Sequence, residues 1–436
     1  MLPDPAGGPR RLRHLGEFSG LAGLAIEQRG LFPAPAPGPA LRERARDVVG
    51  VLDLTAADVR TERTWTAGDL SGEEVSWDVG FGPRTRAYVL RPREAGGAAL
   101  PGVLALHCHA GMKWAGKEKI ADGPEGPSPE VARLRAELYG GRAWAEELAR
   151  RGFTVLVPDV LGWGSRRVPL ADMPDRVRGN PVPGSGGTGH GSSGTGPGSG
   201  DPGPGDPGPG QSGPGQSGLS ETGLGEAGLS EADRYDAAAA RHEHVLAKYC
   251  TVLGTSFAGV VAGEDLAAAA YLRSRPDTGA VAAAGLSGGG LRAALLGAFD
   301  PGLAAVAVVA MISSYRDLLD GYVASHTWML YPPGLSRLCD LPDLVACAAP
   351  RPLLVWYGEH DAILPPEGMR RAHAMITEHY RRDPAGYTGV FGDAGHRFDL
   401  PTQELVFDWL ARHVTTARPT GTAVRPTRTA GGEPRW

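Results

Sequence analysis

The chain has 436 residues, with 44 basic and 49 acidic side chains and a formal net charge of −5. A small negative charge gives no support for a nucleic-acid partner or for binding to an anionic membrane surface. No apolar run reaches the length of a membrane span, and residues 21–26 are too few for the apolar core of a secretory signal. We therefore expect a cytoplasmic protein that binds neither nucleic acid nor a membrane.

Glycine and proline are concentrated in one interior stretch and at the two ends of the chain. Residues 174–228 have almost no large apolar side chains, so burial cannot offset the entropy of ordering them, and we expect a disordered insertion inside one domain. That domain is expected to span 64–414, after an irregular and partly helical extension over 1–63 and before a disordered tail over 415–436. The four cysteines show no C-x-x-C spacing, so we expect reduced thiols and no metal site.

Short apolar runs alternate with helical patterns along this domain. Strands are expected at 64–91 (an antiparallel pair), 101–107, 153–158, 280–284, 303–311, 351–358 and 387–391. Helices are expected at 40–54, 129–151, 230–275, 291–299, 367–382 and 402–414. Breaks are expected near Gly254 and Gly259, and an interruption of 129–151 at Gly140 and Gly141 stays open. This alternation predicts an α/β fold with a mostly parallel central sheet and helices on both faces.

The segment from Ala280 to Phe299 indicates a buried strand, a sharp turn and an amphipathic helix. The turn, G-L-S-G-G at 285–289, is a G-x-S-x-G motif, whose glycines let strand and helix approach while Ser287 is held on a strained turn. A glycine-rich turn that binds an anion at the helix N-terminus is the alternative. The flanking strand and helix favour a nucleophilic serine.

Two further residues follow predicted strands closely. Asp361 comes after the strand at 351–358, and His396 comes after the strand at 387–391. The chain order Ser, Asp, His is that of a triad in which histidine takes the serine proton and aspartate orients the histidine. Asp361 as a helix N-cap and His396 as a loop histidine are the alternatives. Three separate loops in this order favour the triad.

The strand at 101–107 ends in H-C-H-A-G. His107 and His109 share a face at strand spacing and so suit a metal, but the sequence supplies no further placed ligand. A loop of small residues instead suits an oxyanion hole, where backbone N–H groups stabilise developing negative charge. We expect Gly288 N–H as one donor and the N–H of His109 or of Ala110 as the other.

Taken together, these residues resemble the α/β-hydrolase superfamily. Five segments are similar to its acetylxylan-esterase and dienelactone-hydrolase-like branch: L-H-C-H-A-G at 106–111, G-K-E-K-I at 116–120, G-L-S-G-G-G at 285–290, H-T-W at 326–328 and G-D-A-G-H-R-F-D at 392–399. The resemblance implies a serine ester hydrolase that acts on small acyl esters such as acetyl esters. The chain departs from similar sequences at Ser287, where dienelactone hydrolases use cysteine, and at Ala110, where glycine is usual.

Four aromatic residues lie on segments that could reach the serine: Trp114, Trp163, Trp328 and Tyr331. We expect them to form a short, closed pocket for a small acyl group, although each alone is more often part of a core.

Two other functions stay open. One is a prolyl-oligopeptidase-like peptidase, which would normally bring a large extra domain, and the other is a catalytically silent fold used for binding. The complete set of Ser287, Asp361 and His396 favours hydrolysis of a small-molecule ester, which needs no cofactor.

Overall fold

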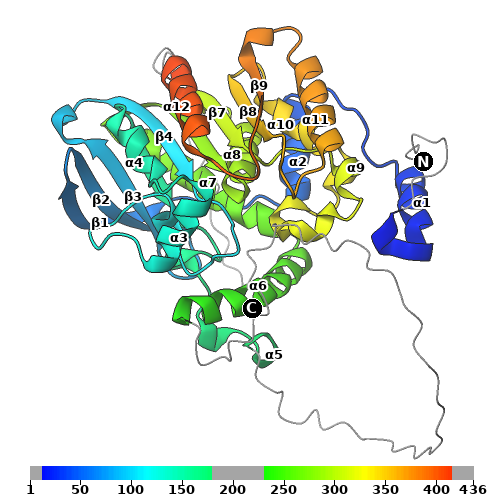
Figure 1. Cartoon of the computed structure of the whole chain (residues 1–436), viewed down its shortest axis with the longest axis horizontal. Helices are drawn as coiled ribbons and strands as arrows, with labels where there is room; N and C mark the ends of the chain where they lie inside the picture. The colour runs from blue at the N-terminus through cyan, green and yellow to red at the C-terminus, as the bar shows by residue number, and fades with distance from the viewer. Residues whose placement is uncertain (1–11, 179–229, 415–436) are drawn as a thin grey trace, which may run out of the picture.

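The computed structural model describes residues 12–178 and 230–414 of the chain (Figure 1). Residues 179–228 of the expected insertion and the tail expected over 415–436 lie outside the described residues. The first residues of the expected insertion are described and form a short helix, Asp175–Arg178, in which Val177 is buried. The described residues form one nine-stranded sheet with helices on both faces, which confirms the expected fold class. The expected domain boundaries stay a prediction.

The strand order in the sheet is β1-β2-β3-β5-β4-β6-β7-β8-β9. The strands are β1 Ala57–Ala67, β2 Leu70–Asp78, β3 Thr85–Pro92, β4 Leu100–Leu106, β5 Thr154–Pro158, β6 Thr278–Leu286, β7 Ala305–Val309, β8 Leu353–Gly358 and β9 Tyr387–Gly392. Pairing is antiparallel from β1 through β3 to β5 and parallel from β5 through β4 to β9. The carboxyl ends of the parallel strands therefore meet at one edge, where their loops gather.

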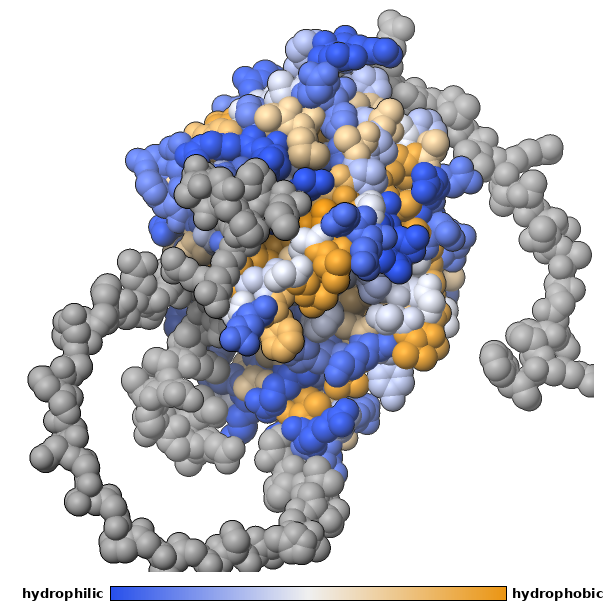
Figure 2. All heavy atoms as spheres, turned by 90° about the vertical axis from the view of Figure 1, so that its right-hand side faces the viewer, coloured by the Kyte–Doolittle hydropathy of each residue, from blue (hydrophilic) through white to orange (hydrophobic). Residues whose placement is uncertain are grey.

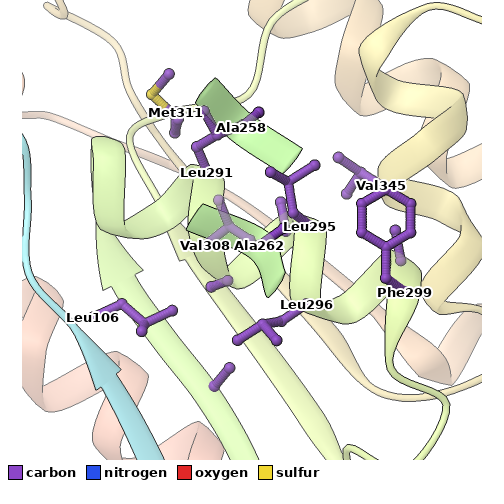
Figure 3. Close-up of a cluster of buried hydrophobic side chains, with 14 of the residues drawn as sticks. Leu106, Ala258, Ala262, Leu291, Leu295, Leu296, Phe299, Val308, Met311 and Val345 are labelled. Atoms are coloured by element: carbon purple, nitrogen blue, oxygen red, sulfur yellow. The ribbon is translucent and has the colours of Figure 1, made fainter. Parts of the chain in front are cut away.

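Side chains along the central strands alternate between two hydrophobic cores. On β4, Leu104 and Leu106 belong to one core, and Val103 and Ala105 belong to the other. The first core is covered by α2 Pro39–Val49, α7 Phe257–Ser274, α8 Gly288–Phe299, α10 Leu341–Val345 and α11 Pro366–His379. The second is covered by α3 Pro129–Leu138, α4 Trp144–Arg150 and α12 Leu400–Val414. Figure 3 shows how the apolar stripe of α8 packs beside α7 in the first core.

Four further helices are described, α1 Gly20–Arg29, α5 Asp175–Arg178, α6 Glu231–Val252 and α9 Tyr315–Leu318. Of these, α9 adds Tyr315 and Leu318 to the first core and α6 adds Cys250. Helix α6 begins with a capping box, in which Ser230 and Asp233 exchange side-chain-to-backbone hydrogen bonds. It packs against α5, against α7 and against the short turn Trp328–Leu330, so it lies over one end of the sheet (Figure 1).

Two local expectations differ from the structure. The expected strand pair over 64–91 is three strands, because the polar edge strand β1 is exposed along most of its length and has no apolar alternation to reveal it. The expected helix break at Gly259 is absent. A Cβ on Gly259 would lie 2.4 Å from Val49 O and from Gly50 O, so this glycine allows α7 to meet the end of α2.

Hydrophobic residues on the face shown in Figure 2 form several groups separated by hydrophilic ones. Within the described part of the chain, no single helix has the length and hydropathy needed to cross a membrane. Helices α6 and α7 pass such a test only as a pair, with a bend of 86° between them.

Candidate active site

Ser287 lies between β6 and α8 and is half-buried among fully buried neighbours. Its backbone has φ 56° and ψ −125°, a region that costs a residue with a side chain about 1–3 kcal/mol. Two hydrogen bonds of 2.9 Å hold this turn, one from Ser287 N to Val309 O and one from Leu291 N to Ser287 O. The turn that the motif predicts is therefore present and strained.

The glycines on either side of the serine are required by close contacts. A Cβ on Gly289 would lie 2.1 Å from Leu106 O at the end of β4, and a Cβ on Gly285 would lie 2.4 Å from the carbonyl carbon of Gly289. Both contacts are with backbone atoms, which cannot move aside as a flexible side chain does. The first turn of α8 is thus packed directly against the end of β4.

Asp361 and His396 follow the neighbouring strands β8 and β9 and contact each other. Asp361 Oδ2 lies 2.7 Å from His396 Nδ1, and Asp361 Oδ1 accepts a hydrogen bond of 2.9 Å from Ile363 N. The Asp361 side chain is fully buried and that of His396 is partly exposed. Because Nδ1 is engaged by the carboxylate, Nε2 is the nitrogen left for a reaction partner.

Ser287 and His396 are not joined by a hydrogen bond among the residues that the structure describes. Their strands nevertheless end at the same edge of the sheet, because β6, β7, β8 and β9 pair in parallel. Catalytic hydrogen bonds are often long before substrate binds. The structure thus brings Asp361 and His396 into contact and places Ser287 at the same edge.

The loop after β4 runs beside the first turn of α8. A Cβ on Gly288 would lie 3.0 Å from His109 N. Ala110 has φ 49°, a conformation that glycine adopts more readily than alanine, which accounts for the glycine usual at this position. Within residues 12–178 and 230–414, neither His109 N–H nor Ala110 N–H donates a hydrogen bond to a protein acceptor. Gly288 is the first residue of α8, so its N–H has no acceptor inside that helix.

A buried carboxylate joins this loop to the segment that carries Trp328. Glu243 Oε2 lies 2.8 Å from His109 Nε2 and 2.8 Å from Lys113 Nζ. Its Oε1 accepts hydrogen bonds from Thr327 Oγ1 at 2.6 Å and from Trp328 N at 3.0 Å. Burial alone would raise the pKa of Glu243, but the charges and hydrogen bonds of Lys113 and His109 hold it well below its usual range.

The hydrogen bonds of the His109 ring fix its tautomer. Gly111 N–H donates to Nδ1 at 3.0 Å, so the proton is on Nε2, which donates to Glu243. Burial lowers the pKa of His109 although the Glu243 carboxylate opposes this effect. The neutral ring is therefore a structural element of the loop, and the backbone N–H is the group free to bind a substrate.

His107 is not part of a metal site in this structure. Its ring is buried, with Nδ1 3.2 Å from Cys108 O, and burial holds its pKa well below the usual range. No group of three or more potential metal ligands occurs in the described ranges.

Trp163 packs against the loop after β4, whereas Trp114 is part of that loop and contacts residues outside it. Trp163 is 1% exposed, stacks on Phe257 at 5.9 Å between ring centroids, and has Lys113 Nζ 3.7 Å from its own ring centroid. It packs beneath the loop instead of lining an open pocket, contrary to the expectation. The ring of Trp114 lies against Tyr235 and 4.0 Å from the Arg167 guanidinium.

Trp328 and Tyr331 line a cavity of about 230 Å³ together with residues of α6 and α7. Trp328 is 43% exposed. The lining does not include Ser287, but the Tyr331 ring lies 6.5 Å from the ring of His326. Trp328 and Tyr331 therefore lie together in a cavity whose lining contains none of Ser287, Asp361 and His396.

His326 connects this cavity to the loop of Asp361. Its Nε2 donates to Ile363 O at 2.8 Å, two residues beyond Asp361. Burial lowers the pKa of His326 to about 4, and the charge of His396 acts in the same direction. The neutral imidazole of His326 thus lies near His396.

Sequence reasoning missed two charged residues that contact the loop after β4, Glu243 and Lys119. A signal existed for Glu243, because Ala239, Glu243 and Ala247 follow one another at helical spacing on the buried stripe of α6. Lys119 lies in the K-E-K run, which reads as an ordinary solvated charge cluster, yet its side chain is fully buried.

No protein-family model matches the sequence, and a search of curated proteins finds no match. Among solved structures, the chain is similar to a protein of Bacteroides fragilis provisionally named an acetyl xylan esterase, with a TM-score of 0.54, 14% identity and 86% of each chain covered. It is also similar to a glucuronoyl esterase from Solibacter usitatus, with a TM-score of 0.51, 14% identity, and 85% of this chain and 92% of that chain covered. With the sheet topology above, these similarities show that the chain has the α/β-hydrolase fold.

Proposed function

We propose that this protein is a serine carboxylic-ester hydrolase that acts on small acyl esters, with Ser287 as nucleophile, His396 as general base and acid, and Asp361 as the residue that orients His396. The observation that carries the proposal is the combination of a strained Ser287 turn with a His396–Asp361 contact of 2.7 Å at the same edge of the sheet. A binding protein has no need of a serine held at a cost in backbone strain.

In the proposed reaction, His396 Nε2 takes the Ser287 proton as Oγ attacks the ester carbonyl, and Asp361 stabilises the imidazolium that forms. The N–H groups of Gly288 and of His109 or Ala110 stabilise the negative oxygen of the tetrahedral intermediate. His396 then protonates the departing alcohol. A water molecule, activated by the same ring, hydrolyses the acyl-enzyme and regenerates Ser287.

The names of the two structural neighbours support an ester as the substrate class, since one is named an acetyl xylan esterase and the other a glucuronoyl esterase. The pocket residues support a small acyl group. Trp328 and Tyr331 are bulky and follow His326, whose Nε2 donates to Ile363 O in the loop of Asp361. The cavity of about 230 Å³ that they line contains neither Ser287 nor His396, so its volume is not that of the acyl site.

Steady-state hydrolysis of p-nitrophenyl acetate by the purified chain tests the proposal, with Ser287→Ala as the matched control. We expect turnover by the wild-type protein and a loss of at least about a thousandfold in the variant. A p-nitroanilide series tests the peptidase alternative in parallel. Turnover that survives in Ser287→Ala, or that is confined to anilides, would contradict the proposal.

A further inference from the structure

The side chain of Lys119 is fully buried at the end of a short helical turn, Lys117–Lys119, and it has no carboxylate partner among the ion pairs of the described residues. Its Nζ instead donates to two consecutive backbone carbonyls, Cys108 O at 2.9 Å and His109 O at 3.0 Å. Burial lowers its pKa to about 8. Burying a lysine without a paired acid costs free energy, and a neutral donor would satisfy the same two carbonyl groups. The buried charge therefore suggests a role beyond packing.

These two carbonyls belong to the peptide units that carry the N–H groups of His109 and Ala110. In a trans peptide the C=O and the N–H point in opposite directions. Because one ammonium group holds both carbonyls, both N–H groups point away from Lys119. Successive N–H groups directed to one side form a concavity that binds anions.

The side opposite Lys119 faces the nucleophile turn. His109 N lies 3.0 Å from the position of a Cβ on Gly288, and Gly288 N–H is the first donor of α8. Neither N–H of the two peptide units has a protein acceptor within the described residues. Both are therefore free to receive a negative oxygen on the acyl carbon attached to Ser287.

Lys119 is itself held rigidly. Arg135 of α3 donates from Nε to Lys119 O at 3.1 Å, and Lys119 N donates to Gly116 O at 3.1 Å. Arg135 also binds the carbonyls of Glu118 and Ala121. Lys119 thus connects α3 with the loop after β4, so that the position of the loop depends on that of α3.

We propose that Lys119 is a positioning residue of the oxyanion hole, which fixes the Cys108–His109 and His109–Ala110 peptide planes so that their N–H groups meet the oxyanion formed at Ser287. The proposal rests on the proposed esterase function. Lys119 touches neither substrate nor nucleophile and acts only through these two peptide planes. The hydrogen bond from Lys119 Nζ to His109 O also explains how the loop keeps Ala110 at a positive φ, because it holds the His109–Ala110 peptide unit in place.

The test compares Lys119→Met with Lys117→Met. Lys117 is a second buried lysine of the same turn, and its Nζ pairs with Asp159 at 3.0 Å and Glu118 at 2.7 Å without touching the loop carbonyls. Active sites are counted by fluorophosphonate labelling, and kcat is expressed per labelled site, so that loss of folded protein does not enter the rate. A trifluoromethyl ketone measures the affinity for an oxyanion.

We expect Lys119→Met to lower kcat per labelled site by about tenfold to a hundredfold, with KM changed by less than about threefold, and to weaken trifluoromethyl ketone binding by a similar factor. Lys117→Met should leave both quantities within about threefold of the wild type. Equal losses in the two variants, or an unchanged kcat in Lys119→Met, would overturn the proposal. No labelling and no turnover in the wild type would overturn the esterase function with it.

If Lys119→Met yields no labelled sites, a crystal structure of the wild-type protein with phenylboronic acid decides the question. The proposal expects a boronate oxygen within hydrogen-bond distance of Gly288 N and of His109 N or Ala110 N, with Lys119 Nζ still on both carbonyls. A boronate oxygen turned away from the loop, or a Lys119 side chain off the carbonyls, would contradict it.

Discussion

Asp361 Oδ2 lies 2.7 Å from His396 Nδ1, while the other oxygen of the carboxylate is occupied by Ile363 N–H. One oxygen thus anchors the carboxylate to its loop and the other orients the imidazole. This division of roles is what a triad acid requires, because the ring must be held in the tautomer that leaves Nε2 free to take a proton.

Asp361→Asn should therefore lower kcat by about a thousandfold to ten-thousandfold, since an amide no longer selects that tautomer. Asp393→Asn is the matched control, because Asp393 lies in the same region but, among the described residues, pairs with the exposed His360 alone. Steady-state kinetics on p-nitrophenyl acetate measure both variants. A large loss in Asp393→Asn with little change in Asp361→Asn would move the acid to Asp393.

Glu243→Gln should destabilise the protein by about 3–5 kcal/mol, because it leaves the buried Lys113 ammonium without its ion-pair partner. Glu378→Gln is the control, since the pair of Glu378 at the end of α11 with Arg381 just beyond it is exposed, and such pairs contribute about 0–1 kcal/mol. Chemical denaturation gives the free energy of unfolding of each variant. A loss in Glu243→Gln no greater than in the control would show that this carboxylate does not hold the two loops together.

The His326 imidazole should make stability depend on pH. Its folded-state pKa of about 4 lies below the value of about 6.5 in an unfolded chain. Between these values the unfolded chain binds more protons, so the free energy of unfolding falls as pH falls from about 6.5 to 4, by at most about 3 kcal/mol. At pH 7.5 the ring is neutral in both states and contributes no such loss.

His326→Gln keeps a donor for Ile363 O and removes the titration. We expect the variant to match the wild type at pH 7.5 apart from a constant packing difference, and to gain on it progressively as the pH is lowered to 4.5. Denaturation curves at the two pH values measure this difference. A difference between the two proteins that does not change with pH would refute the assignment.

Acyl-chain preference tests the pocket. On p-nitrophenyl esters, kcat/KM should be highest from acetate to butyrate and fall steeply by octanoate, because longer chains meet the rings of Trp328 and Tyr331. Trp328→Ala should raise the octanoate-to-acetate ratio of kcat/KM by roughly tenfold, since its side chain is exposed at the cavity and is not part of the core. A maximum at octanoate in the wild type would contradict the small-acyl proposal and leave the triad untouched.

The strands and the three triad candidates were predictable because their signals are local. Ser287, Asp361 and His396 each follow a short apolar run, and strand ends gather at one edge in any parallel sheet. The edge strand β1 was not predictable, because most of its side chains are polar and exposed. Only its pairing with β2 reveals it as a strand.

The contacts that support the loop after β4 were not predictable, because they join segments that are distant in the sequence. The His109–Glu243 hydrogen bond spans 134 residues of sequence. The burial of Lys119 depends on the approach of α3 and the loop after β4, which no pattern in the K-E-K run indicates. The burial of Trp163 was not predictable for the same reason, since its stacking on Phe257 is visible only in the fold.

The measurement that tests the central claim most directly is covalent labelling by a fluorophosphonate, followed by mass spectrometry of the digested protein. The account predicts one adduct per chain, on the peptide that contains Ser287, with labelling abolished in Ser287→Ala and slowed in Asp361→Asn. An adduct on a different serine, or none under conditions in which the protein hydrolyses p-nitrophenyl acetate, would contradict it.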